Sequence, residues 1–206
     1  MKIIRSFFVL IALTTIAGVV NAQMFVSGSI NLSTSMPKTT TGSVTTEGAR
    51  YTYFRVAPAV GYFLNDKLAV GAGVSYSLQK QKQNDVANLT SMFGITPFVR
   101  YYAVSLGDVN IFAQGNVGIE FGANKTKNDG NTTDGPKYLN FGISVMPAIS
   151  YSLGEKLAFE AFLGSVYYSF NREKDEIAGE THTLKTNGFG LNFDMSSISL
   201  GVIYKF

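Results

Sequence analysis

Strict alternation of apolar with small or polar residues runs through the chain from residue 24 onward, and it limits the fold more than any other feature. In Leu68–Gln79 one set of alternate positions is wholly apolar, and the intervening positions hold glycine, alanine, serine and glutamine. Val109–Gly122 repeats the pattern. Successive side chains of a strand point to opposite faces, so a period of two predicts β-strands. Because no later segment shows a helical period, we expect an all-β fold.

Eight segments carry this alternation, and the connections between them alternate in length. The segments are 24–34, 50–64, 68–80, 89–104, 109–123, 138–152, 157–170 and 188–206. Tight turns are expected near 65–67, 105–108 and 153–156, and long polar loops at 35–49, 81–88, 124–137 and 171–187. Short turns at one end and long loops at the other predict an eight-stranded antiparallel up-and-down meander.

Charged residues on the less apolar face indicate where that face points. They lie within the strands and are Arg55, Arg100, Glu120, Glu160 and Lys205. A soluble sandwich or lipocalin-like barrel would bury the apolar face, and charge is rarely buried in soluble proteins. The lumen of a transmembrane barrel is polar, its outer face meets lipid, and its closed sheet satisfies every backbone group. The sequence therefore predicts a transmembrane β-barrel.

Residues 1–22 read as a secretory signal peptide. Lys2 and Arg5 precede an apolar stretch from Phe7 to Val20, and Val20 and Ala22 suit signal-peptidase cleavage. A membrane anchor is the alternative, but the stretch is short of the ~20 residues that span a bilayer. We therefore expect a cleaved leader followed by one barrel domain, 23–206.

Composition excludes several kinds of chemistry. Cysteine is absent and there is one histidine, which argues against a disulfide scaffold, thiol chemistry and a histidine-rich metal site. Removal of Lys2 and Arg5 with the leader leaves 15 basic against 14 acidic residues, so nucleic acid is not an expected partner. The oxygen-rich run 128–135 lacks the twelfth-position acid of a calcium loop and is read as a polar loop. No cofactor or metal is expected.

A short motif, Pro-x-(Val/Ile)-x-Tyr, recurs before the tight turns at 58–62, 97–101 and 147–151, with a reduced form at 200–204. It predicts a girdle of tyrosines at one rim: Tyr62, Tyr101, Tyr151 and Tyr204. Candidates for the opposite girdle are Tyr51, Tyr76, Phe121, Tyr138 and Tyr167. Proline cannot donate to the ladder, so local bulges are expected at the three prolines.

A family resemblance rests on three stretches: 58–71 (PAVGYFLNDKLAVG), the like-built 152–159 (SLGEKLAF), and the C-terminal LGVIYKF. The chain resembles small outer-membrane β-barrel proteins of the OmpX/OmpA-barrel type, especially the outer membrane protein beta-barrel family common in Bacteroidetes-like bacteria. The resemblance implies a Gram-negative outer-membrane, porin-like protein with extracellular loops and periplasmic termini. It also implies that Val202, Tyr204 and Phe206 belong to the signal that the outer-membrane assembly machinery reads.

The small lumen narrows the possible functions, because eight strands leave room only for side chains. We expect a monomer in outer-membrane lipid with a structural, adhesion or surface-interaction role. Its four long loops would contact lipopolysaccharide or a host or cell surface. A narrow channel for ions or small solutes is the alternative. A lipid-modifying enzyme is more remote, because His182, the lone histidine, is expected to be solvated in a loop; the chain is therefore not expected to be an enzyme.

Counting residues from the tight turns sorts the inward charges into two levels. Arg100 and Glu160 fall at one level, and Arg55 and Glu120 at the other. Each pair lies three strands apart in an eight-strand ring, so long side chains can meet across the lumen. We predict that Arg100 pairs with Glu160 and Arg55 with Glu120, and that these pairs close the barrel to ions. The alternative is that each charge is hydrated or bonded to neighbouring Asn, Gln or Tyr side chains.

Overall fold

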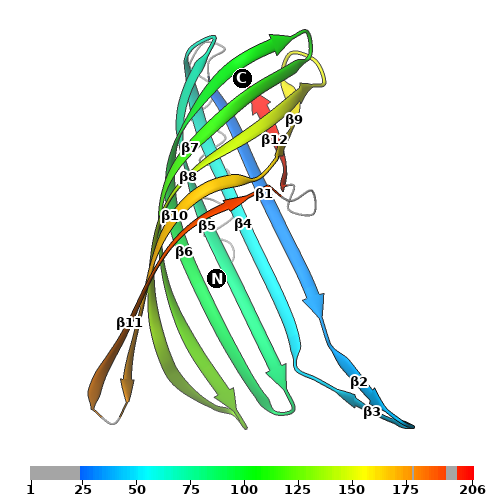
Figure 1. The fold of residues 1–206 in the computed structure, drawn as a ribbon, viewed down its shortest axis with the longest axis vertical. Coiled ribbons are helices and arrows are strands. Elements are labelled where there is room, and N and C mark those ends of the chain that lie inside the picture. The colour runs from blue at the N-terminus through cyan, green and yellow to red at the C-terminus, as the bar shows by residue number, and fades with distance from the viewer. Residues whose placement is uncertain (1–23, 178, 194–198) are drawn as a thin grey trace, which may run out of the picture.

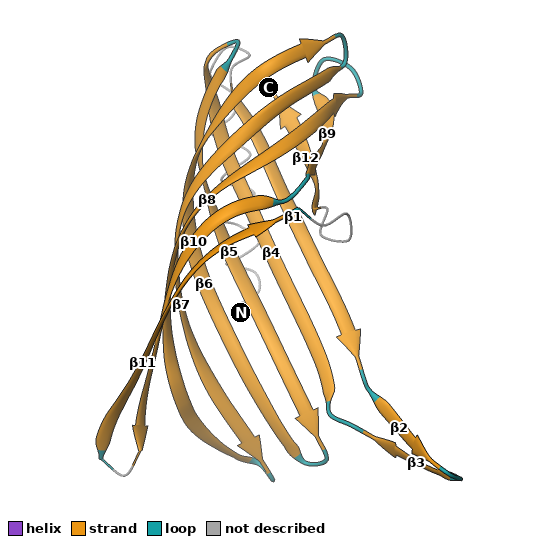
Figure 2. Ribbon diagram, viewed as in Figure 1, coloured by secondary structure: helices purple, strands orange, loops and turns teal. Residues whose placement is uncertain are grey.

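The fold comes from a computed structural model, which describes residues 24–177, 179–193 and 199–206, and it is built from strands (Figure 2). The expected signal peptide, 1–22, lies outside the described residues. The strands are β1 (Met24–Ser35), β2 (Lys38–Thr41), β3 (Val44–Glu47), β4 (Arg50–Asn65), β5 (Leu68–Gln83), β6 (Val86–Leu106), β7 (Val109–Asn128), β8 (Asn131–Ser152), β9 (Leu157–Phe162), β10 (Ser165–Ile177), β11 (Glu180–Asn192) and β12 (Ser199–Lys205).

The strands form a ring of eight antiparallel positions (Figure 1). Six positions hold β1 and β4 to β8, one holds β9 followed by β10, and the last holds β11 followed by β12. The strands β8, β9, β12 and β1 are paired in succession, which closes the ring. The expected eight-stranded antiparallel all-β barrel is therefore confirmed.

Closure is confined to the half of the barrel beside the tight turns, which we call the closed half. There β12 pairs with β9 on one side and, through Val202–Lys205, with Phe25–Gly28 of β1 on the other. Toward the long hairpins, in the open half, β1 from Ser29 to Ser35 pairs with β4. Across the opening, β11 pairs with β10. No register joins β1 to β11 among the described residues, and the two diverge in Figure 1.

The expectation of four long loops is wrong, because the strands continue through most of those residues. The β5–β6 connection is reduced to Asn84 and Asp85, and the β7–β8 connection to Asp129 and Gly130. Asn84, Asp129 and Gly130 have φ angles of 51°, 46° and 81°, the left-handed conformation that tight hairpins require. Residues 35–49 contain the β2–β3 hairpin. Polar composition marked these segments as loops, but a strand that leaves the bilayer can be polar on both faces.

The seventh and eighth expected strands are each interrupted, contrary to the prediction. The segment 157–170 breaks between β9 and β10, where Gly164 has a φ of 128°. Here the Leu163 amide donates to the Pro147 carbonyl at 2.9 Å. The segment 188–206 is split between β11 and β12, and these strands have different partners.

Bulges at Pro58 and Pro97 are also contradicted. The β4–β5 register is the same on both sides of Pro58, from Val56↔Tyr76 to Ala59↔Gly73. The ladder leaves the proline position unpaired without inserting a residue. Register shifts lie elsewhere, between Phe63 and Asn65, Tyr102 and Val104, and Ala123 and Lys125. Only at Pro147 does the facing strand shift, at the break between β9 and β10.

Candidate functional site: the barrel lumen

The centre of the closed half is an ion pair between Arg100 of β6 and Glu160 of β9. Arg100 Nη1 lies 2.6 Å from Glu160 Oε1, and Nη2 lies 3.2 Å from Oε2, so the contact is bidentate. Both side chains are at most 3% exposed. Arg100 Nε also donates to Gln114 Oε1 at 2.6 Å. A buried charge pair is tolerated only when its geometry is good and its remaining polar atoms are bonded, and both conditions hold here.

Aromatic rings enclose this ion pair. The Arg100 guanidinium carbon lies 5.0 Å from the ring centroid of Phe25, 5.2 Å from that of Phe98 and 5.1 Å from that of Phe112. These distances fit cation–π contacts. Further ring-to-ring contacts extend the group, which we call the aromatic plug: Phe25, Phe63, Phe98, Tyr102, Phe112 and Phe162. The plug and the ion pair fill the lumen at the tight-turn end.

Two glycines make room for the plug. A Cβ at Gly61 of β4 would collide with the Phe25 ring, and one at Gly71 of β5 with the Phe98 ring. Phe25 is fully buried and Phe98 nearly so. Small residues facing large rings let a narrow barrel reach dense packing.

The sequence did not predict the aromatic plug, whose inward-facing rings differ from the polar lumen that we expected. In the closed half, phenylalanines occupy inward positions of strands whose outward positions are also apolar, so alternation does not separate the faces. The stretch Phe98-Val99-Arg100-Tyr101-Tyr102 held a usable signal. Its alternate positions place two aromatic rings on the same face of the strand as the charged Arg100. Lys205 also faces inward, with its Nζ 5.7 Å from the centroid of the Phe63 ring.

The second ion pair lies at the start of the open half. Arg55 Nη2 is 3.0 Å from Glu120 Oε1, and Ser75 Oγ donates to the same oxygen at 3.3 Å. The Arg55 side chain is 35% exposed and that of Glu120 is 23% exposed. The structure thus brings together both ion pairs that residue counting suggested. The Arg100–Glu160 pair is buried, and the Arg55–Glu120 pair is partly exposed.

A cavity of about 540 Å³ begins above the aromatic plug and reaches the second ion pair. Arg100, Glu160 and Phe162 form its floor, and Arg55 and Ser75 line it higher up. The expectation of a lumen filled by side chains therefore holds at the tight-turn end and is wrong above the aromatic plug. Among the described residues β1 and β11 do not pair, so no hydrogen-bonded strands close the wall around the upper part of this cavity.

The outer surface carries an apolar band bounded by charge. On β5 the outward residues are apolar from Leu68 to Leu78, and Lys80 and Lys82 follow. With a rise of ~3.3 Å per residue and a tilt of ~45°, the ten steps from Leu68 to Leu78 cover roughly 23 Å along the barrel axis. That height matches the apolar band of transmembrane barrels, about 25 Å.

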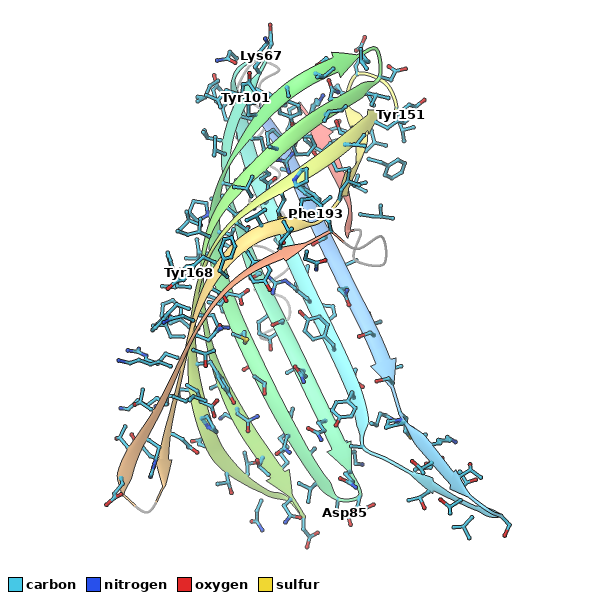
Figure 3. All side chains as sticks on the ribbon, viewed as in Figure 1. Lys67, Asp85, Tyr101, Tyr151, Tyr168 and Phe193 are labelled. Atoms are coloured by element: carbon cyan, nitrogen blue, oxygen red, sulfur yellow. The ribbon has the colours of Figure 1, made fainter. Side chains whose placement is uncertain are left out.

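Four tyrosines surround the tight-turn rim of this band. Tyr62, Tyr101, Tyr151 and Tyr204 are all exposed on the outer face, and Figure 3 shows Tyr101 and Tyr151 near the tight turns. At the other margin Tyr76, Phe93 and Phe121 stand in register on β5, β6 and β7. Three candidates for this second girdle face the lumen instead: Tyr51, Tyr138 and Tyr167. Each of the three lies directly opposite a residue of the neighbouring strand that faces the lumen, and paired residues share a face of the sheet.

The three residues proposed as an assembly signal lie on the last strand and at its end. Val202 and Tyr204 are exposed on the outer face. The Phe206 amide donates to the Met24 carbonyl at 3.0 Å, and its ring meets that of Tyr204 edge-on at 5.1 Å. The first and last described strands thus meet at the tight-turn end.

The remaining candidates lie on the projecting hairpins. His182 is exposed on β11 opposite Asp175, so its expected loop position is wrong. The run 128–135 forms the β7–β8 hairpin, where Lys125 pairs with Asp134 at 3.3 Å. No cluster of three or more His, Cys, Asp or Glu that could hold a metal occurs within the described ranges. Nor does any helix in the described part of the chain have the length and apolarity to cross a membrane.

Comparison with known proteins gives a fold relationship. No family model matches the sequence, and no curated protein is a significant match. A major outer membrane protein from Thermus thermophilus is similar over 91% of this chain and 100% of its own, at 10% identity and a TM-score of 0.51. Neisserial surface protein A is similar over 89% of this chain and 97% of its own, with 14% identity and a TM-score of 0.43.

The attachment invasion locus protein Ail of Yersinia pestis is similar over 91% of this chain and 100% of its own, with 11% identity and a TM-score of 0.42. At these identities the likeness to the Thermus protein concerns the fold alone. It agrees with the class that the strand order and the outer surface define, a small antiparallel β-barrel.

Proposed function

We propose that this chain is an outer-membrane β-barrel protein that acts as a surface-interaction element. The observation that carries the proposal is the pairing of an apolar outer band with buried charge inside. Apolar side chains cover the outer face between Tyr62 and Lys80, while Arg100 and Glu160 lie in the lumen. Lipid outside and polar groups inside describe a transmembrane barrel.

In this proposal the tight turns lie on the periplasmic side, as does the end of the barrel where β1 pairs with β12. The long hairpins project from the cell surface. Strands β6, β7 and β8 have 21, 20 and 22 residues, about twice what a tilted strand needs to cross a bilayer. Their surplus length, with the β2–β3 and β10–β11 hairpins, forms the surface that would meet lipopolysaccharide or another cell. The protein would act as a monomer.

The lumen would not conduct solutes, because the aromatic plug and the Arg100–Glu160 pair block its tight-turn end. A narrow channel is the second candidate, favoured by the cavity of about 540 Å³ above the aromatic plug. That cavity stops at the plug, so conduction would require the plug to move. The enzyme alternative gains no support from His182, which is exposed on a projecting hairpin.

Cell fractionation with external protease tests the location. We expect the protein in the outer-membrane fraction, with cleavage in the β10–β11 hairpin of intact cells and an N-terminus at Gln23. Recovery in the soluble fraction would contradict the outer-membrane location. An N-terminus at Met1 would contradict cleavage of the signal peptide.

Planar-bilayer conductance of the refolded chain tests the closed lumen. Silence is expected from the parent chain. A stable open state would favour the channel instead.

A further inference from the structure

The inner surface of the open half carries an uncharged polar pocket that the barrel role does not explain. Its walls come from four adjacent strands and enclose about 290 Å³. We call it the polar trough; its lining residues are Gln79, Gln81, Asn88, Thr90, Asn124, Pro136 and Tyr138. None of these is charged, in contrast with the two ion-pair levels below.

Cross-strand register builds the floor of the trough. Gln79 of β5 lies opposite Thr90 of β6, and Thr90 lies opposite Asn124 of β7. Asn124 Nδ2 donates to Thr90 Oγ1 at 2.9 Å, and Asn88 Oδ1 accepts from Thr126 Oγ1 at 2.7 Å. Each amide has two N–H donors and an acceptor oxygen, so these bonds fix the side chains and use only part of their capacity.

Tyrosines flank the amide floor on both sides. Tyr138 lines the trough from β8. On β4, Tyr51 and Tyr53 are opposite Gln81 and Gln79, and the Tyr51 hydroxyl accepts from Gln81 Nε2 at 3.1 Å. The trough therefore combines fixed amides with aromatic faces.

This chemistry selects a class of ligand. Sugar hydroxyls both donate and accept hydrogen bonds, which suits amide and hydroxyl side chains, and the C–H face of a sugar ring packs on an aromatic ring. The lining residues carry no charge to pair with an ionic group, and the carboxylate of Glu173, opposite Tyr138 on β10, disfavours an anion. A volume of about 290 Å³ lies at the small end of ligand pockets, as a short saccharide requires.

The position of the trough makes it reachable. Gln79 and Gln81 flank Lys80, where charge ends the apolar band on β5, so the trough lies beyond the membrane-facing part of the barrel. The absence of β1–β11 pairing in the described part of the chain leaves the inner face of the open half accessible from the side. We propose that the polar trough binds a neutral saccharide. This deepens the proposed surface role by naming its ligand class.

The test uses the isotope-labelled chain refolded in a zwitterionic detergent without a sugar headgroup, because maltoside or glucoside headgroups would compete. Maltotriose, chitotriose and lactose are the probes, each titrated to the millimolar range, with inorganic phosphate as an anionic comparison. We expect side-chain amide shifts at Gln79, Gln81 and Asn124 with at least one saccharide and none with phosphate.

Variants then assign the site. Tyr138→Leu and Asn88→Leu should each weaken binding about tenfold, whereas Tyr138→Phe, which keeps the ring, should bind within about threefold of the parent. Asn31→Leu is the matched control, since Asn31 is on β1 outside the trough lining.

Absence of shifts with all three saccharides in the folded parent chain would overturn the proposal. So would shifts outside the trough, stronger effects from phosphate, or unchanged binding in both Leu variants. Shifts in the parent chain locate the site even if a variant fails to fold. Because this assay needs no cell, its failure is distinct from failure of the fractionation experiment.

Discussion

The two ion pairs of this barrel have the same chemistry but different surroundings. Arg100 and Glu160 are at most 3% exposed and lie among aromatic rings in the closed half. Arg55 and Glu120 are 35% and 23% exposed, and Arg55 lines the cavity above the aromatic plug. The difference follows from the walls, because β12 completes the ring around the first pair, whereas β1 and β11 diverge beside the second. Burial, rather than pairing, is expected to set what each contact contributes.

The largest contrast is expected from removing one arginine at a time. Arg100→Ala leaves Glu160 as an uncompensated buried charge and should lower the free energy of unfolding by about 3–5 kcal/mol. Arg55→Ala should cost less, about 1 kcal/mol, because Glu120 is partly exposed to water and keeps Ser75 as a hydrogen-bond donor. Urea unfolding of the refolded variants measures both, and a double-mutant cycle with Glu160→Ala gives the coupling. Equal losses would remove the distinction between a dry and a wet pair.

The aromatic plug offers a second contrast, between inward and outward rings. Phe112 is buried between Tyr102 and Phe162, and Phe112→Ala should cost about 3–5 kcal/mol through the cavity it leaves. Phe121→Ala, at an exposed ring of the same strand, is the control and should cost much less in detergent. Thermal unfolding by gel mobility compares the two. A more stable Phe112→Ala than Phe121→Ala chain would refute the plug as a source of stability.

Glycines that face the two halves should respond differently to one added methyl group. Gly61→Ala forces Cβ into the Phe25 ring and is expected to cost about 1–3 kcal/mol. At Gly142 the nearest atom to an added Cβ is the Tyr168 carbonyl oxygen, 3.6 Å away, so Gly142→Ala should be nearly neutral. Denaturation midpoints of the two variants settle the comparison, and a costly Gly142→Ala would show that the open half is also tightly packed.

A smaller effect is expected in the β2–β3 hairpin on acidification. The Lys38 ammonium, 2.7 Å from the Glu47 carboxylate, lowers the pKa of Glu47. A lowered folded-state pKa means that the contribution is present above the unfolded pKa of Glu47 and is lost as pH falls through the folded value. The protection factors of the amides in 38–47, which are the exchange rates corrected for the intrinsic pH dependence of exchange, should therefore fall on acidification in the parent chain. Glu47→Gln should remove that pH dependence, and an unchanged profile in the variant would exclude this pair as its cause.

The smallest effect on stability is expected from deleting Phe206. Its described contacts are one backbone hydrogen bond and the ring of Tyr204, at the rim. The deleted chain should refold in detergent with nearly parental stability but reach the outer membrane in lower amounts. Quantitative blotting of membrane fractions measures this. Equal amounts of both chains would argue against an assembly role for Phe206.

The sequence was informative for residue types that fit only one face of the barrel wall, such as charged residues within the strands. Alternation predicted the strands, and counting from the tight turns put Arg100 level with Glu160 and Arg55 level with Glu120, where the structure brings them together. The aromatic plug was missed because strands apolar on both faces have no visible alternation. Polar hairpin strands were missed because composition alone does not separate them from loops.

The opening between β1 and β11 could not be predicted from local pattern. Both strands alternate, and whether they pair depends on register and on the path between β11 and β12. Tyr51, Tyr138 and Tyr167 were assigned to the wrong face because a tyrosine near the edge of the apolar band can face either the lipid or the lumen.

Hydrogen exchange along β1 tests most directly the claim that the barrel is closed in one half and open in the other. We predict slow exchange for all amides of Phe25–Gly28, which pair with both β4 and β12. From Ser29 to Ser35, alternate amides should stay protected by β4 while those on the other edge exchange rapidly. Uniform slow exchange to Ser35 would mean that β1 and β11 pair along their length, and it would contradict the account.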